Sequence, residues 1–204
     1  MRFAQLKLGP MANFSYVFGD DAGRGAIVDP GFEPERLLAE ADRLGLAVER
    51  VLITHGHDDH VRGLDHVVRA TRAKVVAHPD SRLPFDVATT HGGAFHVGAL
   101  EVRAWHTPGH QPDAVSFEVD RRLLFTGDTL FIGECGRADL PGSDPRALHA
   151  SLLGVLASLP RHLEVYPGHD YGPLPHATLG HEFESNYTLE PRDVEAFVRF
   201  MAEP

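Results

Sequence analysis

Short apolar runs with the spacing of β-strands alternate along the chain with segments whose apolar residues recur at helical spacing. Strand runs are rich in β-branched and aromatic residues, and glycine, proline or asparagine separates them. In the first half this pattern predicts strands over residues 3–8, 14–19, 26–29, 48–54 and 74–77. It predicts helices over 34–44 and 61–71, with Gly45 at the position that ends the first helix.

The second half repeats this organisation, with strands first and helices afterwards. Strands are expected over 95–97, 100–106, 114–119, 123–126 and 163–166, with Asp120-Arg121 as a tight link between two of them. Helices are expected over 145–157, where Asp144 caps the N-terminus and Pro145 opens the first turn, and over 191–201. The pattern therefore predicts an α/β protein with two strand-rich halves, forming one domain over 1–204.

Composition narrows the class of protein. The chain has 204 residues, 43% of them hydrophobic, which is enough for one sizeable core. A net charge of −10 argues against partners such as nucleic acid or an anionic membrane. The single cysteine, Cys135, excludes an internal disulfide framework and fits a reducing compartment. The first eight residues alternate unlike a signal peptide, and no apolar run approaches the roughly 18 residues of a membrane span. We expect a cytoplasmic protein.

Fourteen histidines stand out, and four potential metal ligands fall within the segment Thr54-His55-Gly56-His57-Asp58-Asp59-His60. This segment directly follows the continuous apolar run 51–53, which is typical of a strand buried on both faces. In an extended loop His55 and His57 point to the same side, whereas Asp59 and His60 begin the next helix and diverge from them. That arrangement suits two metal ions side by side better than one.

Three more potential ligands follow predicted strands across glycine-containing turns: His110, Asp128 and His169. Glycine lets the backbone turn tightly, so that the next side chain faces the end of the strand. Imidazole and carboxylate ligands suit zinc, iron and manganese alike. Two such ions can generate hydroxide and polarise a carbonyl oxygen, so that no serine or cysteine nucleophile is required.

These residues resemble the metallo-β-lactamase superfamily, whose H-x-H-x-D-H motif is followed by His, Asp and His in this order. The resemblance implies a four-layer αβ/βα sandwich with the metals at one edge, between its two sheets. It implies a first ion, most simply zinc, held by His55, His57 and His110. The second ion would be held by Asp59, His60 and His169, and Asp128 would bridge the two. Asp59 and Asp128 are thereby the expected catalytic carboxylates.

The loop 133–142 resembles that of glyoxalase II-like hydrolases and of persulfide dioxygenases. In both groups a basic residue similar to Arg137 and a tyrosine similar to Tyr171 contact the glutathione part of the substrate. Full-length glyoxalase II adds a C-terminal helical region, whereas only 35 residues follow His169 here. The ending resembles short bacterial glyoxalase II-like hydrolases and persulfide dioxygenases alike.

We therefore expect a hydroxyacylglutathione hydrolase-type thioesterase with two divalent ions, acting on a glutathione thioester or a related thiol derivative. The alternative is a glutathione persulfide dioxygenase with a single Fe(II) on His55, His110 and Asp128. A third interpretation is a non-catalytic metal-binding protein, against which all seven ligands argue. A homodimer is compatible with the sequence.

For three further residues the sequence leaves two interpretations open. Asp29 either braces the histidine segment or is a turn residue before Pro30. Arg137 either binds a substrate carboxylate or pairs within its own loop with Asp139 or Glu134. Cys135 either lies near the metals or is a small packed hydrophobe.

Overall fold

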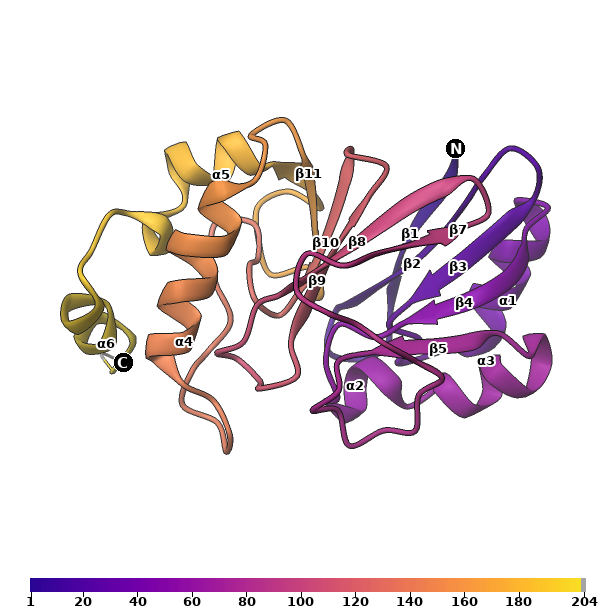
Figure 1. The fold of residues 1–204 in the computed structure, drawn as a ribbon, viewed down its shortest axis with the longest axis horizontal. Helices are drawn as coiled ribbons and strands as arrows, with labels where there is room; N and C mark the ends of the chain where they lie inside the picture. Colours follow the sequence, from indigo (N-terminus) through magenta and orange to yellow (C-terminus); the bar gives the residue numbers. More distant parts are fainter. Residues whose placement is uncertain (203–204) are drawn as a thin grey trace.

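The first half of the chain forms one six-stranded sheet with helices on its outer side (Figure 1). A computed structural model describes residues 1–202. The strands are β1 (Arg2–Leu8), β2 (Asn13–Gly19), β3 (Arg24–Val28), β4 (Ala47–Leu52), β5 (Lys74–Ala77) and β6 (Val87–Ala88). The helices are α1 (Pro34–Arg43), α2 (Asp58–Val61) and α3 (Leu64–Thr71). The strands lie in sequence order, antiparallel from β1 to β3 and parallel from β3 to β6.

The second half forms a matching sheet in the order β12-β11-β10-β9-β8-β7. Its strands are β7 (Ala94–Val97), β8 (Leu100–His106), β9 (Val115–Val119), β10 (Leu123–Gly127), β11 (Glu164–Pro167) and β12 (Ala177–Thr178). Its helical segments are α4 (Pro145–Ala150), η1 (Ser151–Val155), η2 (Leu156–Ser158), α5 (Leu179–Ser185), η3 (Tyr187–Leu189) and α6 (Val194–Ala202). Only β10 and β11 are parallel, and the helical segment from α4 to η2 is their crossover.

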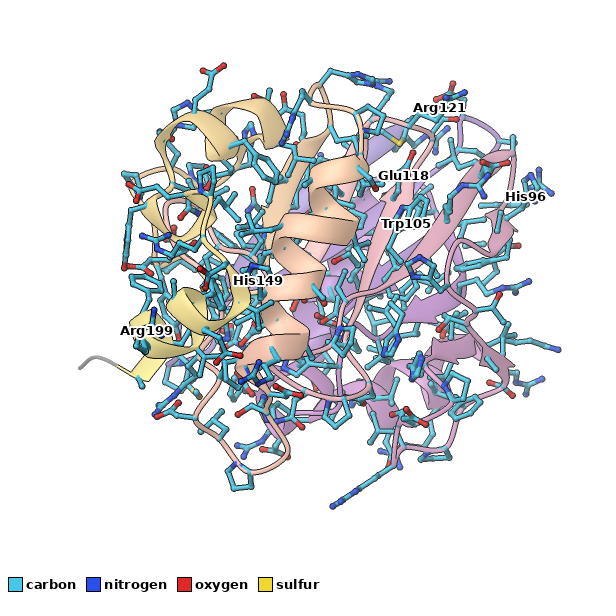
Figure 2. The ribbon with its side chains drawn as sticks, turned by 60° about the vertical axis from the view of Figure 1, so that its left-hand side comes forward. His96, Trp105, Glu118, Arg121, His149 and Arg199 are labelled. Carbon is cyan, nitrogen blue, oxygen red and sulfur yellow. The ribbon has the colours of Figure 1, made fainter. Side chains whose placement is uncertain are left out.

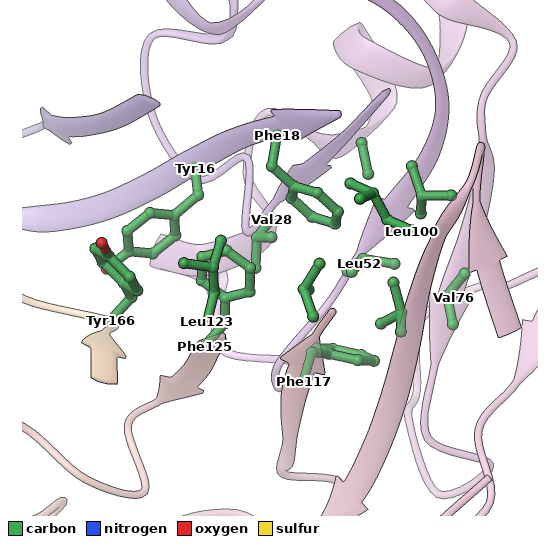
Figure 3. Close-up of a cluster of buried hydrophobic side chains, with 14 of the residues drawn as sticks. Tyr16, Phe18, Val28, Leu52, Val76, Leu100, Phe117, Leu123, Phe125 and Tyr166 are labelled. Atoms are coloured by element: carbon green, nitrogen blue, oxygen red, sulfur yellow. The ribbon is translucent and has the colours of Figure 1, made fainter. Parts of the chain in front are cut away.

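The two sheets face each other, with α1 and α3 beyond the first and α4 to α6 beyond the second (Figure 1). The predicted four-layer sandwich is confirmed. Side chains from both sheets fill the space between them, including Phe18 and Leu52 from one side and Phe117 and Phe125 from the other (Figure 3). Full burial of each such side chain contributes about 1.5–3 kcal/mol to folding.

Alternation along the strands explains how each sheet holds two apolar layers at once. In β4 and the residue after it, Leu52 faces the other sheet, whereas Val51 and Ile53 face α1 and α3. In β10, Phe125 faces the first sheet and Leu124 faces the helices of the second half. Because successive side chains in a strand point to opposite faces, strands covered on both sides have continuous apolar runs.

The helices differ in detail from the prediction. The segment 61–71 is divided, because α2 begins at Asp58 and the amide of Gly63 donates to the carbonyl of Pro30 before α3 starts. The segment 145–157 continues from α4 through a π-helical turn and a 3₁₀ turn, and the last helix begins at Val194. The short elements β6, β12, α5 and η3 were not predicted. No helix within 1–202 is long and apolar enough to cross a membrane.

The outer face of the second sheet is only partly covered by helices (Figure 2). Nε2 of His149 in α4 donates a hydrogen bond to the carbonyl of Arg192, and its ring lies edge-on to Phe197, which fixes α6 against α4. Farther along the sheet, the indole N–H of Trp105 donates to the carboxylate of Glu118 at 2.9 Å. This polar pair lies where β8 and β9 extend beyond α4.

Candidate metal centre

All seven side chains predicted as metal ligands lie together at one end of the sandwich, where the two sheets meet. They come from segments that follow strands: His55, His57, Asp59 and His60 after β4, His110 after β8, Asp128 after β10 and His169 after β11. Backbone hydrogen bonds join the sheets at this end, since the amide of Phe14 donates to Gly168 and that of Val115 to Thr54. The ligand segments are therefore held by both halves of the fold.

The first group consists of three imidazoles. Nδ1 of His57 lies 3.1 Å from Nε2 of His55 and 3.1 Å from Nε2 of His110. His57 stands just before α2 with an extended backbone, which turns its ring toward the other two. These three nitrogens can be ligands of a single ion.

The second group consists of Asp59, His60 and His169. Nε2 of His60 lies 3.2 Å from Nε2 of His169. Oδ2 of Asp59 lies 3.5 Å from the first of these nitrogens and 3.4 Å from the second. Asn13 donates from Nδ2 to Oδ2 of Asp59 at 2.8 Å and so fixes the carboxylate in this position.

The carboxylate of Asp128 lies between the two groups. Its Oδ1 is 3.3 Å from Nε2 of His60, and its Oδ2 is 3.4 Å from His169 and 3.5 Å from His110. The buried Oδ1 accepts no hydrogen bond from residues 1–202. Gly168 makes room for it, because a Cβ there would lie 2.2 Å from Oδ1.

The spacing of these atoms fits bound metal ions. A tetrahedral ion with ligands at about 2.0–2.1 Å separates the ligand atoms by roughly 3.3–3.4 Å. In five of the six pairs within these groups, the nitrogen and oxygen atoms are 3.1–3.5 Å apart, and all atoms of a group lie within 4.8 Å of one another. Imidazole nitrogen and carboxylate oxygen are ligands of zinc, iron and manganese. The donor set therefore fits one ion in each group, with Asp128 placed to reach both.

Hydrogen bonds at Nδ1 leave Nε2 free to act as the ligand in four of the five histidines. Nδ1 of His110 donates to the carbonyl of Arg137, and Nδ1 of His169 donates to the carbonyl of Met11, both at 2.9 Å. His60 donates to Asp29, and His55 contacts the hydroxyl of Thr54. Such outer partners fix the tautomer and the ring orientation of metal-binding histidines.

Asp29 braces the histidine segment, which was one of the two interpretations of its position at the end of a strand. Its Oδ2 lies 3.0 Å from Nδ1 of His60 and also accepts the hydroxyl of Thr54, whose amide donates to Oδ1 at 2.7 Å. Asp29 has a φ of 48°, a left-handed conformation that aspartate tolerates better than most residues. Asp29 therefore both forms the turn at the end of the strand and supports the histidine segment through its carboxylate.

Burial and neighbouring charge prepare this site for cations. Burial, together with the imidazole of His60, holds the pKa of His55 well below its usual value, which favours the neutral form. Burial alone would raise the pKa of Asp128, but His60 and His169 outweigh it and keep the carboxyl ionised. Burial would lower the pKa of His60, and the Asp128 and Asp29 carboxylates raise it well above its usual value. The carboxylates thus favour positive charge at the centre.

A cleft of 420 Å³ opens over the centre. Its wall includes His57, Asp59, His110, Asp128 and His169, together with Met11, Phe131, Glu134, Cys135, Arg137, Leu140 and Tyr171. The ring of Tyr171 stacks on that of His169 at 4.6 Å, and its side chain is 55% exposed. Tyr171 is therefore available to a molecule in the cleft.

Arg137 also lines this cleft, but its guanidinium makes two hydrogen bonds of 2.6 Å to the carboxylate of Asp139. This is the pairing that the sequence left open as an alternative. Cys135 is packed beside Met201, and burial raises the pKa of its thiol to about 12. Cys135 therefore lies near the candidate metals and is also a packed, protonated side chain.

Three supporting groups were not found from the sequence. They are the carbonyl of Met11, the carbonyl of Arg137 and the side chain of Asn13. A main-chain carbonyl acceptor has no residue signature, and a single asparagine before a strand resembles an ordinary turn residue. These contacts require knowledge of which distant segments the fold brings together.

A model of the metallo-beta-lactamase superfamily matches residues 8–169, a range that contains all seven clustered side chains. The chain belongs to this superfamily, as the motif predicted.

Three similar proteins bear on the activity or on the metal content. A hydroxyacylglutathione hydrolase of Anaeromyxobacter dehalogenans is 42% identical over 161 residues, which cover 78% of this chain and 62% of that protein. The crystal structure of ETHE1 from Myxococcus xanthus has a TM-score of 0.93 at 32% identity, covering 100% of this chain and 91% of that one. A crystal structure of TTHA1623 in a di-iron-bound form has a TM-score of 0.76 at 35% identity, covering 90% and 98%. The chain thus spans less than two thirds of the first of these relatives.

Proposed function

We propose that this protein is a metal-dependent hydrolase of the hydroxyacylglutathione hydrolase type. Its substrate would be a thioester of glutathione or of a related thiol. The observation that carries the proposal is the position of Asp128, whose two oxygens lie within 3.5 Å of ligand atoms from both groups. A carboxylate in this position can reach both ions of a pair about 3.5–4 Å apart, which is the spacing of two-metal hydrolytic sites.

In this proposal His55, His57 and His110 would hold the first ion, and Asp59, His60 and His169 would hold the second. Asp128 would be a ligand of both. When bound, two such ions supply hydroxide at neutral pH and polarise the thioester carbonyl. Zinc is the metal we expect, and the same donors accept iron or manganese. The relative from Anaeromyxobacter dehalogenans supports the thioester substrate, and the di-iron form of TTHA1623 supports two ions.

The chain's own residues would orient the substrate above this centre. Tyr171 stacks on His169 and presents its hydroxyl at the rim, where it can hydrogen-bond an amide of the thiol part. Arg137 can take a substrate carboxylate by exchanging its partner Asp139, since both side chains are exposed and their pair is weak. Met11 and Phe131 would provide apolar surface for the substrate in this cleft.

A second candidate is a persulfide dioxygenase with one Fe(II) on His55, His110 and Asp128. The similarity to ETHE1 favours it, because that likeness extends over the entire chain at a TM-score of 0.93. The same seven side chains are compatible with both functions. The second group, Asp59 and His169 in particular, separates them, because only the two-ion hydrolase uses it for catalysis.

Elemental mass spectrometry on the purified protein, followed by two assays, tests the proposal. We expect close to two ions per chain, hydrolysis of S-lactoylglutathione, and loss of that activity in His55→Ala, Asp128→Ala and His169→Ala. His96→Ala is the matched control, because His96 lies on the surface of β7, away from the centre (Figure 2). One iron per chain, oxygen uptake with glutathione persulfide and harmless Asp59→Ala and His169→Ala substitutions would replace the hydrolase by the dioxygenase.

A further inference from the structure

A second cleft, of 490 Å³, shares His57 with the cleft over the candidate active site. The loop between β5 and β6 contributes Asp80 and Arg82, and the loop after β8 contributes Gln111 and Asp113. Gly142, from the segment before α4, also lines this cleft. Since His57 lines both clefts, a molecule reaching the metal centre can extend into this one.

The carboxylate of Asp113 faces this cleft without a hydrogen-bond partner among the described residues. The residue is 7% exposed, and no side chain or amide within residues 1–202 donates a hydrogen bond to its carboxylate or forms an ion pair with it. A Cβ built on Gly56 would lie 3.0 Å from Oδ2 of Asp113 and 3.9 Å from the hydroxyl of Ser81. The absence of a side chain at Gly56 therefore leaves space beside the carboxylate. A carboxylate in such an enclosed position is stabilised by a donor or a cation that binds beside it.

Arg82 lines the same cleft and has no carboxylate partner among the described residues. It differs in this from Arg137, whose guanidinium is held by Asp139. The other acidic residue of this wall, Asp80, lies 3.7 Å from Nδ1 of His78. The amide of Asp80 donates to that nitrogen, so the exposed Asp80 carboxylate is not held by His78. The cleft therefore offers two carboxylates, of which Asp113 is the more enclosed, and one guanidinium without a carboxylate partner among the described residues. Guanidinium binds carboxylates through two parallel hydrogen bonds, and a carboxylate binds ammonium.

We propose that this cleft binds an unblocked α-amino-acid head group, with its ammonium on Asp113 and its carboxylate on Arg82. This inference rests on the proposed function and deepens it, because the γ-glutamyl end of glutathione carries such a head group. The thioester carbonyl would lie at the metal centre, while the free amino-acid end extends past His57. A cleft with charges of both signs favours a zwitterion over a simple anion.

Binding of unreactive ligands tests this assignment without any turnover. Calorimetric titration of the metal-loaded protein would compare S-methylglutathione with N-acetyl-S-methylglutathione, in which the ammonium is removed. For the wild type we expect acetylation to weaken binding by about 10- to 100-fold, the value of a hydrogen bond to a charged group. In Asp113→Asn, S-methylglutathione should bind more weakly, and acetylation should have little further effect. This loss of dependence is the signature of a direct contact.

Arg82→Gln provides an independent variant, because Arg82 is exposed and its replacement leaves the core intact. This variant should bind S-methylglutathione more weakly than the wild type does. It should also no longer distinguish S-methylglutathione from an analogue whose γ-glutamyl carboxylate is converted to an amide. Asp65→Asn and Arg69→Gln, on the exposed side of α3, are the charge-matched controls and should bind like the wild type. The assignment would be overturned if Asp113→Asn still distinguished the acetylated ligand, and Arg82→Gln the amidated ligand, as strongly as the wild type does. If the wild type hydrolyses no thioester, the proposed function fails, whereas intact hydrolysis with unchanged discrimination refutes only the head-group site.

Discussion

The carboxylate of Asp29 lies 3.0 Å from Nδ1 of His60, and both side chains are buried. The same carboxylate accepts the amide of Thr54, so it holds the strand end and the histidine at once. His60 presents its other nitrogen to Asp128 and His169. Asp29 therefore sets the orientation of a ring that joins the second ligand group to the bridging carboxylate.

Asp29→Asn should weaken metal binding while keeping the fold. The amide oxygen can still accept from Thr54, but the NH₂ group cannot accept the Nδ1 proton of His60. Loss of such an outer partner lowers metal affinity by about 10- to 100-fold. Competition with a chromophoric chelator measures the metal affinity of the variant and of the wild type.

The control for this substitution is Asp20→Asn, which alters another buried carboxylate at the opposite end of β2. Asp20 accepts the amides of Arg24 and Ala99 and has no contact with the candidate centre. Its replacement should lower the melting temperature and leave metal affinity unchanged. If Asp29→Asn bound metal as tightly as the wild type, Asp29 would not be needed to orient His60.

Gly168→Ala should disturb the centre through a single methyl group. The added Cβ would lie 2.2 Å from Oδ1 of Asp128 and 2.8 Å from Cε1 of His60, so these groups must move. We expect a destabilisation of about 1–3 kcal/mol, typical of overpacking, and fewer bound ions per chain. Thermal unfolding and elemental analysis measure the two effects.

Gly154→Ala is the matched control, since a Cβ at Gly154 meets nothing within 4 Å. Because this glycine lies in the helical turn η1, alanine there should be neutral or stabilising by about 0.5–1 kcal/mol. If both alanine variants keep full metal content, close packing at Gly168 has no bearing on the centre.

The sequence predicts the strands and the ligands well because both depend on local pattern. His55 to His60 lie in one short segment behind a buried strand, and β4 and β10 carry continuous apolar runs. By contrast, the carbonyl that fixes His169 belongs to Met11, 158 residues away, and no local pattern records such a pairing. The division of the helix at Gly63 likewise depends on a distant partner, the carbonyl of Pro30.

Cys135 should react slowly with alkylating reagents in the folded protein, despite lining the cleft. Burial raises the pKa of its thiol to about 12, and only the thiolate is nucleophilic. At pH 8 almost all of the thiol is protonated, so the labelling rate with iodoacetamide should rise about tenfold per pH unit up to the pKa. In urea the same cysteine should react like a free thiol. Mass spectrometry measures the extent of labelling over time. Fast stoichiometric labelling of the native protein at pH 7 would contradict the prediction.

Arg137 and Asp139 offer opposite substitutions at one proposed substrate contact. If the guanidinium binds a substrate carboxylate by releasing Asp139, Arg137→Gln should raise KM about 3- to 10-fold with kcat unchanged. Asp139→Asn removes the competitor and should lower KM by up to about fivefold, because an exposed pair is worth at most about 1 kcal/mol. Arg146→Gln is the control, since Arg146 makes a similar exposed pair with Glu195 outside the cleft. Steady-state kinetics with S-lactoylglutathione decides the question. A KM that stays the same in both variants would mean that the Arg137–Asp139 pair only holds its own loop.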